Sequence, residues 1–177
     1  MAETGLYIGR FQPFHLGHLE VVKHVLEKVG RIIIVIGSAQ YSHTLENPFT
    51  AGERLTMIKR ALDEAEISPT KYLVVPIPDM NVHKLWVAQV VSQTPEFHIV
   101  YSNEPLTVTL FVEAGFKVEA IPFFSREEYS ATEIRKRMIN RQEWSTLVPR
   151  SVAEYVREIK GDARLRNLSG SDRLPKL

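Results

Sequence analysis

An uninterrupted run of β-branched apolar residues, Ile-Ile-Ile-Val-Ile at positions 32–36, constrains the fold more than any other feature of the sequence. A strand that is apolar at every position fits a parallel sheet covered on both faces, because neither face then meets water. Four further apolar stretches are also short enough to be strands. They lie at residues 6–9, 72–77, 97–101 and 117–121.

Helical patterns separate these strands. Apolar residues at positions 19, 22, 26 and 29 fall on one face of a helix. Capping boxes, in which a hydroxyl residue precedes a glutamate by three positions, begin at Thr50 and Ser130. Strands that alternate with helices predict an α/β fold, built on a single Rossmann-like, doubly wound parallel sheet with C-terminal helices. Helices are expected from residue 19 onward and over residues 51–65, 85–91, 106–114, 131–139 and 151–160.

No linker, repeat or low-complexity segment interrupts this alternation. Residues 1–161 are therefore predicted to form one α/β domain, a usual size for a chain with one core. Residues 162–177 are polar and basic, so they are expected to be a loosely ordered tail or to lie in oligomer contacts.

Composition limits the chemistry. The chain has no cysteine, which excludes disulfides, thiolate nucleophiles and sulfur-ligated metal sites. Its net charge of +1 gives no general attraction to nucleic acid or to a membrane. No basic region followed by an apolar stretch opens the chain, and its longest apolar run is too short to span a bilayer. We therefore expect a cytoplasmic protein with neither nucleic acid nor membrane as partner.

The loop after the first strand is predicted to bind phosphate. It runs from Gly9 to His18 with the sequence G-R-F-Q-P-F-H-L-G-H and leads into the first helix. A helix N-terminus presents unpaired N–H groups and partial positive charge, to which Arg10, His15 and His18 would add. Gly17 would let a phosphate approach the backbone closely. For an isolated H-x-G-H match, a structural role of one histidine as a cap or packing group is the alternative.

A second cluster lies at the start of the helix over residues 131–139. Ser130 and Glu133 explain the helix start without any ligand. The three consecutive cations at 135–137 are not explained in this way, because the helix dipole disfavours positive charge near an N-terminus. A bound anion would remove the conflict, and Thr132 and Arg135 share a helix face. We therefore predict that Thr132 and Arg135 bind a phosphate tail, while the two following cations fit a solvated face.

Other candidates follow the second and third strands, since ligands of such sheets bind at the carboxyl ends of strands. Ser38 and Gln40 supply small polar groups there. Asp79 could hold a magnesium ion through water or cap the following helix. Trp86 either stacks on a flat heterocycle or packs in the core. Arg54 either reaches a substrate or pairs with an acidic neighbour.

The chain contains neither the P-loop pattern nor a G-x-G-x-x-G after its first strand. Instead it carries G-R-F-Q-P-F-H-x-G-H, I-G-S-A-Q, N-P-F-T-A-G-E-R and Y-S-x-T-E-I-R. Together these resemble the archaeal-type nicotinamide-nucleotide adenylyltransferases of the H-x-G-H nucleotidyltransferase superfamily. The first and last motifs mark the superfamily, and the middle two narrow it to this family. The resemblance extends over residues 5–160.

The resemblance implies the nucleotidyltransferase fold and a reaction in which ATP and nicotinamide mononucleotide give NAD and pyrophosphate, with Mg²⁺. It also implies a homo-oligomer, often a hexamer. The implied catalytic residues are His15, His18, Arg10 and Arg135, with His18 at the α-phosphate. The implied ATP site comprises Gly9, Arg10, Phe11, His15, Gly17, His18, Ser130, Thr132 and Arg135. The implied mononucleotide site comprises Ser38, Gln40, Arg54, Asp79, Asn81, His83 and Trp86, with Trp86 stacking on the nicotinamide.

Two positions depart from the family pattern. Residues 102–105 read Ser-Asn-Glu-Pro where relatives tend to read S-G-N-P, and His83 stands where asparagine is frequent. Both bear on the choice between the amide and acid forms of the mononucleotide. Two other functions are open at this point. One is another H-x-G-H adenylyl- or cytidylyltransferase, for example one acting on phosphopantetheine. The other is a nucleotide-binding module without catalysis, against which the complete motifs argue.

Overall fold

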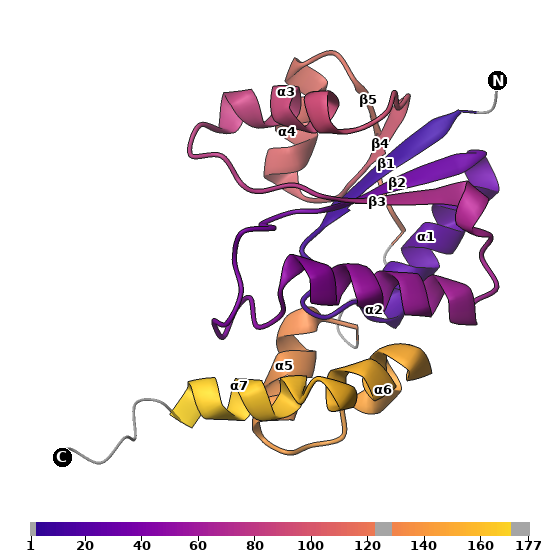
Figure 1. Cartoon of the computed structure of the whole chain (residues 1–177). Coiled ribbons are helices and arrows are strands. Elements are labelled where there is room, and N and C mark those ends of the chain that lie inside the picture. Colours follow the sequence, from indigo (N-terminus) through magenta and orange to yellow (C-terminus); the bar gives the residue numbers. More distant parts are fainter. Residues whose placement is uncertain (1–2, 123–128, 171–177) are drawn as a thin grey trace. The chain divides into compact units, whose positions relative to one another are not determined.

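The computed structural model describes residues 3–122 and 129–170 (Figure 1). The chain divides into two compact units. The first comprises Met1–Arg10, Glu20–Gln40 and Ile67–Phe124, and the second comprises Phe11–Leu19, Tyr41–Glu66 and Ser125–Leu177. That residues 1–161 act as a single domain stays a prediction.

The first unit holds a five-stranded, fully parallel sheet in the order β3-β2-β1-β4-β5. The predicted α/β class and parallel sheet are confirmed. The order places the first strand in the middle, so the chain winds outward in one direction and then in the other. The strands are β1 (Thr4–Gly9), β2 (Arg31–Ile36), β3 (Tyr72–Pro76), β4 (Ile99–Tyr101) and β5 (Lys117–Glu119).

Both faces of this sheet are covered. On one face Leu6 and Ile33 pack with apolar residues of α3 (His83–Gln93) and α4 (Pro105–Glu113). Side chains alternate along a strand, so Gly5 faces the other side, where the Val25 side chain of α1 (Leu16–Lys28) lies against it. Figure 1 shows α3 and α4 on one side of the strands and α1 on the other. This arrangement explains why β2 is apolar at five consecutive positions.

The second unit is helical around a small core of its own. Its helices are α2 (Ala51–Glu64), α5 (Ala131–Ile139), α6 (Arg150–Glu158) and α7 (Gly161–Gly170). Helix α2 packs against α6, and α7 packs against both α5 and α6. Ile58 of α2, Met138 of α5 and Val152 of α6 are fully buried. Short 3₁₀ turns also occur, η1 (Pro69–Lys71) in the first unit and η2 (Ser145–Leu147) in the second.

The helix caps follow the sequence in part. Thr50 and Glu53 form the expected capping box at the start of α2. Ser130 caps α5 by accepting from the backbone N–H of Glu133, but the Glu133 carboxylate accepts from Arg137. The last predicted helix begins one residue before position 151 and has Pro149 as its N-cap residue.

The expectation of a loosely ordered tail was wrong for residues 162–170. They belong to α7, in which Leu165 is fully buried and Arg164 forms an ion pair with Glu53. Because the segment is polar, its sequence did not indicate the buried Leu165 or its two ion pairs, Arg164 with Glu53 and Arg166 with Asp162. Residues 171–177 lie outside the described part of the chain. Within residues 3–122 and 129–170, no helix combines the length and apolar character needed to cross a membrane.

Candidate nucleotide site

The two histidines of the H-x-G-H motif cap each other. The backbone N–H of His15 donates to Nδ1 of His18 at 3.2 Å, and the backbone N–H of His18 donates to Nδ1 of His15 at 3.3 Å. Their rings stack with centroids 3.5 Å apart. A ring nitrogen that accepts a hydrogen bond carries no proton, so these bonds assign the Nε2–H form to both neutral rings. Each imidazole therefore keeps Nε2–H as its donor.

Burial keeps this pair uncharged. Phe11 and Phe14 pack on the His18 ring at centroid distances of 4.9 and 5.5 Å, and His15 is 6% exposed. Burial lowers the pKa of His15 to about 4. Burial, and then repulsion from His15, lower the pKa of His18 well below its usual value. Glycine at position 17 lets the His15 ring lie close to the backbone, because a Cβ there would be 3.1 Å from the ring and would force it to shift. The two rings thus act as neutral hydrogen-bond donors at pH 7.

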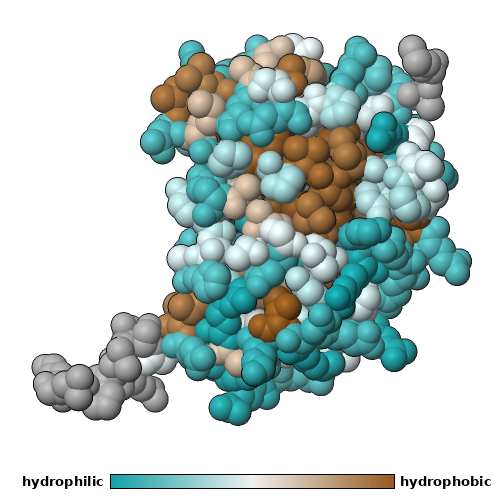
Figure 2. All heavy atoms as spheres, viewed as in Figure 1, coloured by the Kyte–Doolittle hydropathy of each residue, from teal (hydrophilic) through white to brown (hydrophobic). Residues whose placement is uncertain are grey.

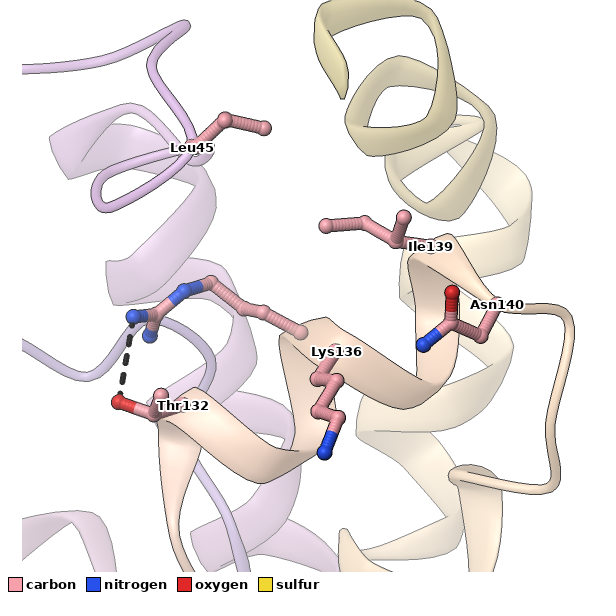
Figure 3. A pocket seen from close by; sticks show the side chains of 6 residues that line it. Leu45, Thr132, Lys136, Ile139 and Asn140 are labelled. Atoms are coloured by element: carbon pink, nitrogen blue, oxygen red, sulfur yellow. Dashed lines mark hydrogen bonds between the residues drawn. The ribbon is translucent and has the colours of Figure 1, made fainter. Parts of the chain in front are cut away.

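Arg135 lies against the loop that carries the histidines. Its Nη1 donates to the main-chain carbonyl of Gln12 at 2.9 Å, and its Nη2 donates to Thr132 Oγ1 at 3.4 Å (Figure 3). The side chain is 8% exposed. The two predicted phosphate clusters, far apart in sequence, therefore meet within the second unit. A pocket of about 220 Å³ borders Thr132 and Arg135 and is also lined by Leu45, Lys136, Ile139 and Asn140.

Gln12 is not among the predicted site residues. Its side chain is 2% exposed and makes two hydrogen bonds to the backbone of Phe49. The signal available was a polar side chain between two aromatic residues of a short loop, a place where burial demands partners.

Arg54 is placed differently from the expectation of a substrate contact. It is fully buried in the second unit, where Nε donates to the Thr50 carbonyl and Nη2 donates to the Tyr41 carbonyl. These bonds hold the segment before α2 against the helix. A role of Arg54 in mononucleotide binding stays a prediction.

Three residues predicted for the mononucleotide come together in the first unit. Both the backbone N–H and the hydroxyl of Ser38 donate to the Asp79 carboxylate, at 3.0 and 2.7 Å. The Gln40 side chain exchanges two hydrogen bonds with the backbone of Asp79. The loops after β2 and β3 are therefore joined at the carboxyl ends of these strands.

Trp86 lies at the edge of the core, and its stacking on a heterocycle stays a prediction. Its ring is partly buried and meets Phe111 edge-on at 5.9 Å, beside the core of the first unit. Its indole N–H is buried and has no hydrogen-bond partner among the described residues. Asn81 and His83 are exposed, and His83 begins α3. Arg10 is exposed directly after β1.

The unusual residues at 103 and 104 have structural roles. Asn103 pairs through both side-chain atoms with the backbone of Ile121. The Glu104 carboxylate caps α4 by accepting from the backbone N–H groups of Leu106 and Thr107. Although burial acts to raise its pKa, these hydrogen bonds hold it below the usual value. The departure from the family pattern thus stabilises a loop and a helix start.

Comparison with known proteins identifies the family of this chain. The family model described as cytidylyltransferase-like matches residues 6–137. A nicotinamide-nucleotide adenylyltransferase of Saccharolobus solfataricus is 49% identical over 169 residues, covering 96% of this chain and 98% of the relative. The protein of the same name from Archaeoglobus fulgidus is 53% identical and covers 94% of this chain and 97% of that protein.

Solved structures show the same fold. A bifunctional NMN adenylyltransferase/ADP ribose pyrophosphatase from Francisella tularensis, complexed with AMP and a manganese ion, superposes with a TM-score of 0.77 at 20% identity. The superposition covers 98% of this chain and 54% of that one, so this chain spans about half of the bifunctional protein. The chain therefore belongs to the cytidylyltransferase-like family and, within it, to the nicotinamide-nucleotide adenylyltransferases.

Proposed function

We propose that this chain transfers the adenylyl group of ATP to nicotinamide mononucleotide, forming NAD and releasing pyrophosphate. The observation that carries the proposal is the bond from Arg135 to the loop that holds the stacked imidazoles. It brings together, in one unit, two motifs that are predicted to bind anions. The names of relatives about half identical to this chain support the same reaction.

The reaction follows from these groups without a general base. An oxygen of the mononucleotide 5′-phosphate, already an anion, attacks the α-phosphorus of ATP, and the bond from that phosphorus to the bridging oxygen breaks. Pyrophosphate leaves with the electron pair. The difficulty is the approach of two anions, so the protein's task is positioning and charge stabilisation.

The residues divide this task by their charge. His15 and His18 would donate neutral Nε2–H groups, while Arg10 and Arg135 would bring permanent positive charge. A hydrogen bond to a charged group contributes roughly 1.5–3 kcal/mol. Two that tighten in the transition state would therefore accelerate the reaction by several powers of ten.

Mg²⁺ is proposed to enter with ATP. Among residues 3–122 and 129–170, no group of three or more histidine or carboxylate side chains could hold a metal ion. This fits a magnesium ion held mostly by phosphate oxygens and water, as is usual for such ions. Bound there, it would neutralise phosphate charge. The expected result of titrating Mg²⁺ is activity that follows the Mg·ATP concentration.

The mononucleotide is proposed to bind at the loops of the first unit. The joined pair of Ser38 and Asp79 would form a fixed wall, and Trp86 would offer its ring to the nicotinamide. Exposed Asn81 and His83 lie in the loop and first turn that lead to Trp86.

We also propose a cytoplasmic homo-oligomer, with a hexamer as the arrangement that the resemblance implies. Its support is a set of apolar side chains exposed on the first unit, at the α3 end in Figure 2 and on α4: Val82, Leu85, Val91, Leu106 and Val112. Exposed apolar groups are typical of interaction surfaces where they form a contiguous patch. Light scattering of the purified protein measures its mass directly.

The decisive experiment supplies purified protein with ATP and a panel of phosphorylated acceptors. We expect pyrophosphate and a dinucleotide with nicotinamide mononucleotide, and the ratio to nicotinate mononucleotide gives the preference. Product formed only with phosphopantetheine would identify a different transferase. ATP binding in a calorimeter without pyrophosphate release from any acceptor would identify a binding module.

A further inference from the structure

We infer that Gln12 is a positioning residue for Arg135. We also infer that helix α7 holds Gln12 in place through the segment that contains Phe49. The inference rests on the proposed function only in what Arg135 does to ATP. It concerns the hydrogen bonds that join the loop at residues 11–15 to the segment at residues 47–50, which we call the clasp. All of its members lie in the second unit.

The side chain of Gln12 pairs with one residue through both of its polar atoms. Its Nε2 donates to the Phe49 carbonyl at 3.0 Å, and its Oε1 accepts from the Phe49 backbone N–H at 2.9 Å. A flipped amide would set donor against donor and acceptor against acceptor, so only one orientation satisfies the pair. Since Gln12 is 2% exposed, loss of these bonds would leave Phe49 backbone groups buried without partners.

The main chain of the same residue contacts the guanidinium. The bond from Arg135 Nη1 to the Gln12 carbonyl, at 2.9 Å, is shorter than the 3.4 Å contact with Thr132 Oγ1. Because the side chain of Gln12 is held by Phe49, the main-chain carbonyl of Gln12 stays in one position as a hydrogen-bond acceptor. The orientation of Arg135 therefore depends on whether Gln12 is held by Phe49.

Phe49 is held in turn by α7. Its ring is fully buried, and a Cβ at Gly161 would lie 2.5 Å from that ring, so the close approach requires glycine. Arg164 donates to the Pro48 carbonyl at 2.9 Å and forms a two-bond ion pair with Glu53 at 2.7 and 2.8 Å. Bidentate pairs of this kind fix direction as well as charge.

Glu53 closes the network. It is the glutamate of the capping box, accepting from the Thr50 backbone N–H at 2.9 Å while also binding Arg164. Arg164 and Glu53 side chains are 20% and 17% exposed, so solvent screens the pair only partly. The segment before α2 is therefore held both by Arg164 and by Glu53. Because Gln12 binds this segment, the carbonyl that accepts from Arg135 is held in place as well.

The test compares Gln12→Met, which preserves side-chain length but removes both hydrogen bonds, with Val152→Ala as a control. Val152 is buried in α6 and forms none of the hydrogen bonds of the clasp, so its truncation should lower stability while leaving those bonds in place. We expect Gln12→Met to weaken ATP binding about tenfold, the equivalent of one hydrogen bond to a charged group. The KM for the mononucleotide should stay within about twofold, and the control should change neither constant.

A double-mutant cycle then distinguishes positioning of Arg135 by Gln12 from a general effect of Gln12 on stability. In an Arg135→Ala background, Gln12→Met should have no further effect on ATP affinity, because the group it positions is gone. Arg164→Lys, which keeps the charge but loses the fork, should weaken ATP binding in the same direction by a smaller factor. This milder variant provides the answer if Gln12→Met does not fold.

Two results would overturn the inference. One is a Gln12→Met protein with lowered melting temperature but unchanged ATP affinity. The other is an equal loss of ATP affinity with and without Arg135. Calorimetric ATP binding needs no turnover, so a protein that binds ATP but makes no dinucleotide would refute the proposed function and still decide this question.

Discussion

The two groups of predicted site residues are held in different ways. In the second unit His15 and Arg135 are buried and His18 is partly buried, and all three are fixed by bonds to main-chain groups. In the first unit Ser38 and Asp79 bind each other near the ends of two strands, and the following segment, including Asn81, is exposed. The difference suits their proposed tasks, since donors stabilise a transition state best when the fold already holds them in place. A substrate pocket needs to admit a ligand.

The largest expected effect tests the fixed group. His18→Ala should lower kcat by about 10²–10³, the typical loss of one donor at a reacting centre. The KM for the mononucleotide should change far less, and steady-state kinetics with both substrates measures this. A comparable loss in kcat and in mononucleotide binding would place His18 away from the reacting phosphate.

The second effect is on stability in acid. The pKa of His15 is about 4 in the folded protein and near 6.5 in an unfolded chain, so the unfolded state binds more protons between these values. The free energy of unfolding should therefore fall as pH drops from 6.5 towards 4, by up to about 1.4 kcal/mol per pH unit for each such histidine. His18 should act in the same direction.

The chain offers a way to read this effect in one unit. Of its two tryptophans, Trp86 lies in the first unit and Trp144 in the second. In a Trp86→Phe background, urea unfolding followed by tryptophan fluorescence reports on the second unit. His15→Gln in that background should reduce the slope with pH. An unchanged slope would mean that the acid sensitivity arises elsewhere.

A smaller effect tests the residues proposed for the mononucleotide in the first unit. Trp86→Ala should raise the KM for the mononucleotide about tenfold, the value of one aromatic stacking contact. The KM for ATP should change little. Trp86→Phe is the matched variant, since it keeps a ring, and it should recover most of the affinity. An unchanged mononucleotide KM in Trp86→Ala would assign the ring to the core alone.

The smallest effect concerns the joined loops. Ser38→Ala removes the 2.7 Å bond to Asp79 but keeps the bond from the Ser38 backbone. We expect a loss of about 1 kcal/mol in the free energy of unfolding, measured with urea. Any kinetic change should be confined to the mononucleotide. A change confined to ATP would contradict the division between the two groups.

Several features were predictable because they are local or periodic. The apolar run of β2, the glycine-bearing loop after β1 and the capping box at Thr50 are each visible within a few residues of sequence. The family and the enzyme class, identified from four motifs, are confirmed by relatives that match nearly the whole chain. The individual roles of the site residues stay predictions.

Other features depended on contacts between distant segments. Nothing near Arg135 in sequence shows that it meets the Gln12 carbonyl, 123 positions away. The well-ordered helix over residues 162–170 likewise depends on a distant contact. Arg164 forms an ion pair with Glu53, 111 positions away.

The sequence by itself determined the alternation of strands and helices and the chemical groups that a nucleotide would meet, because periodicity and residue type are written along the chain. Only the tertiary structure decided that the imidazoles are neutral, since burial sets their charge. It also decided that the Gln12 carbonyl accepts from Arg135 and that α7 packs against Phe49. Burial and long-range hydrogen bonding are properties of the folded chain, and no short stretch of residues contains them.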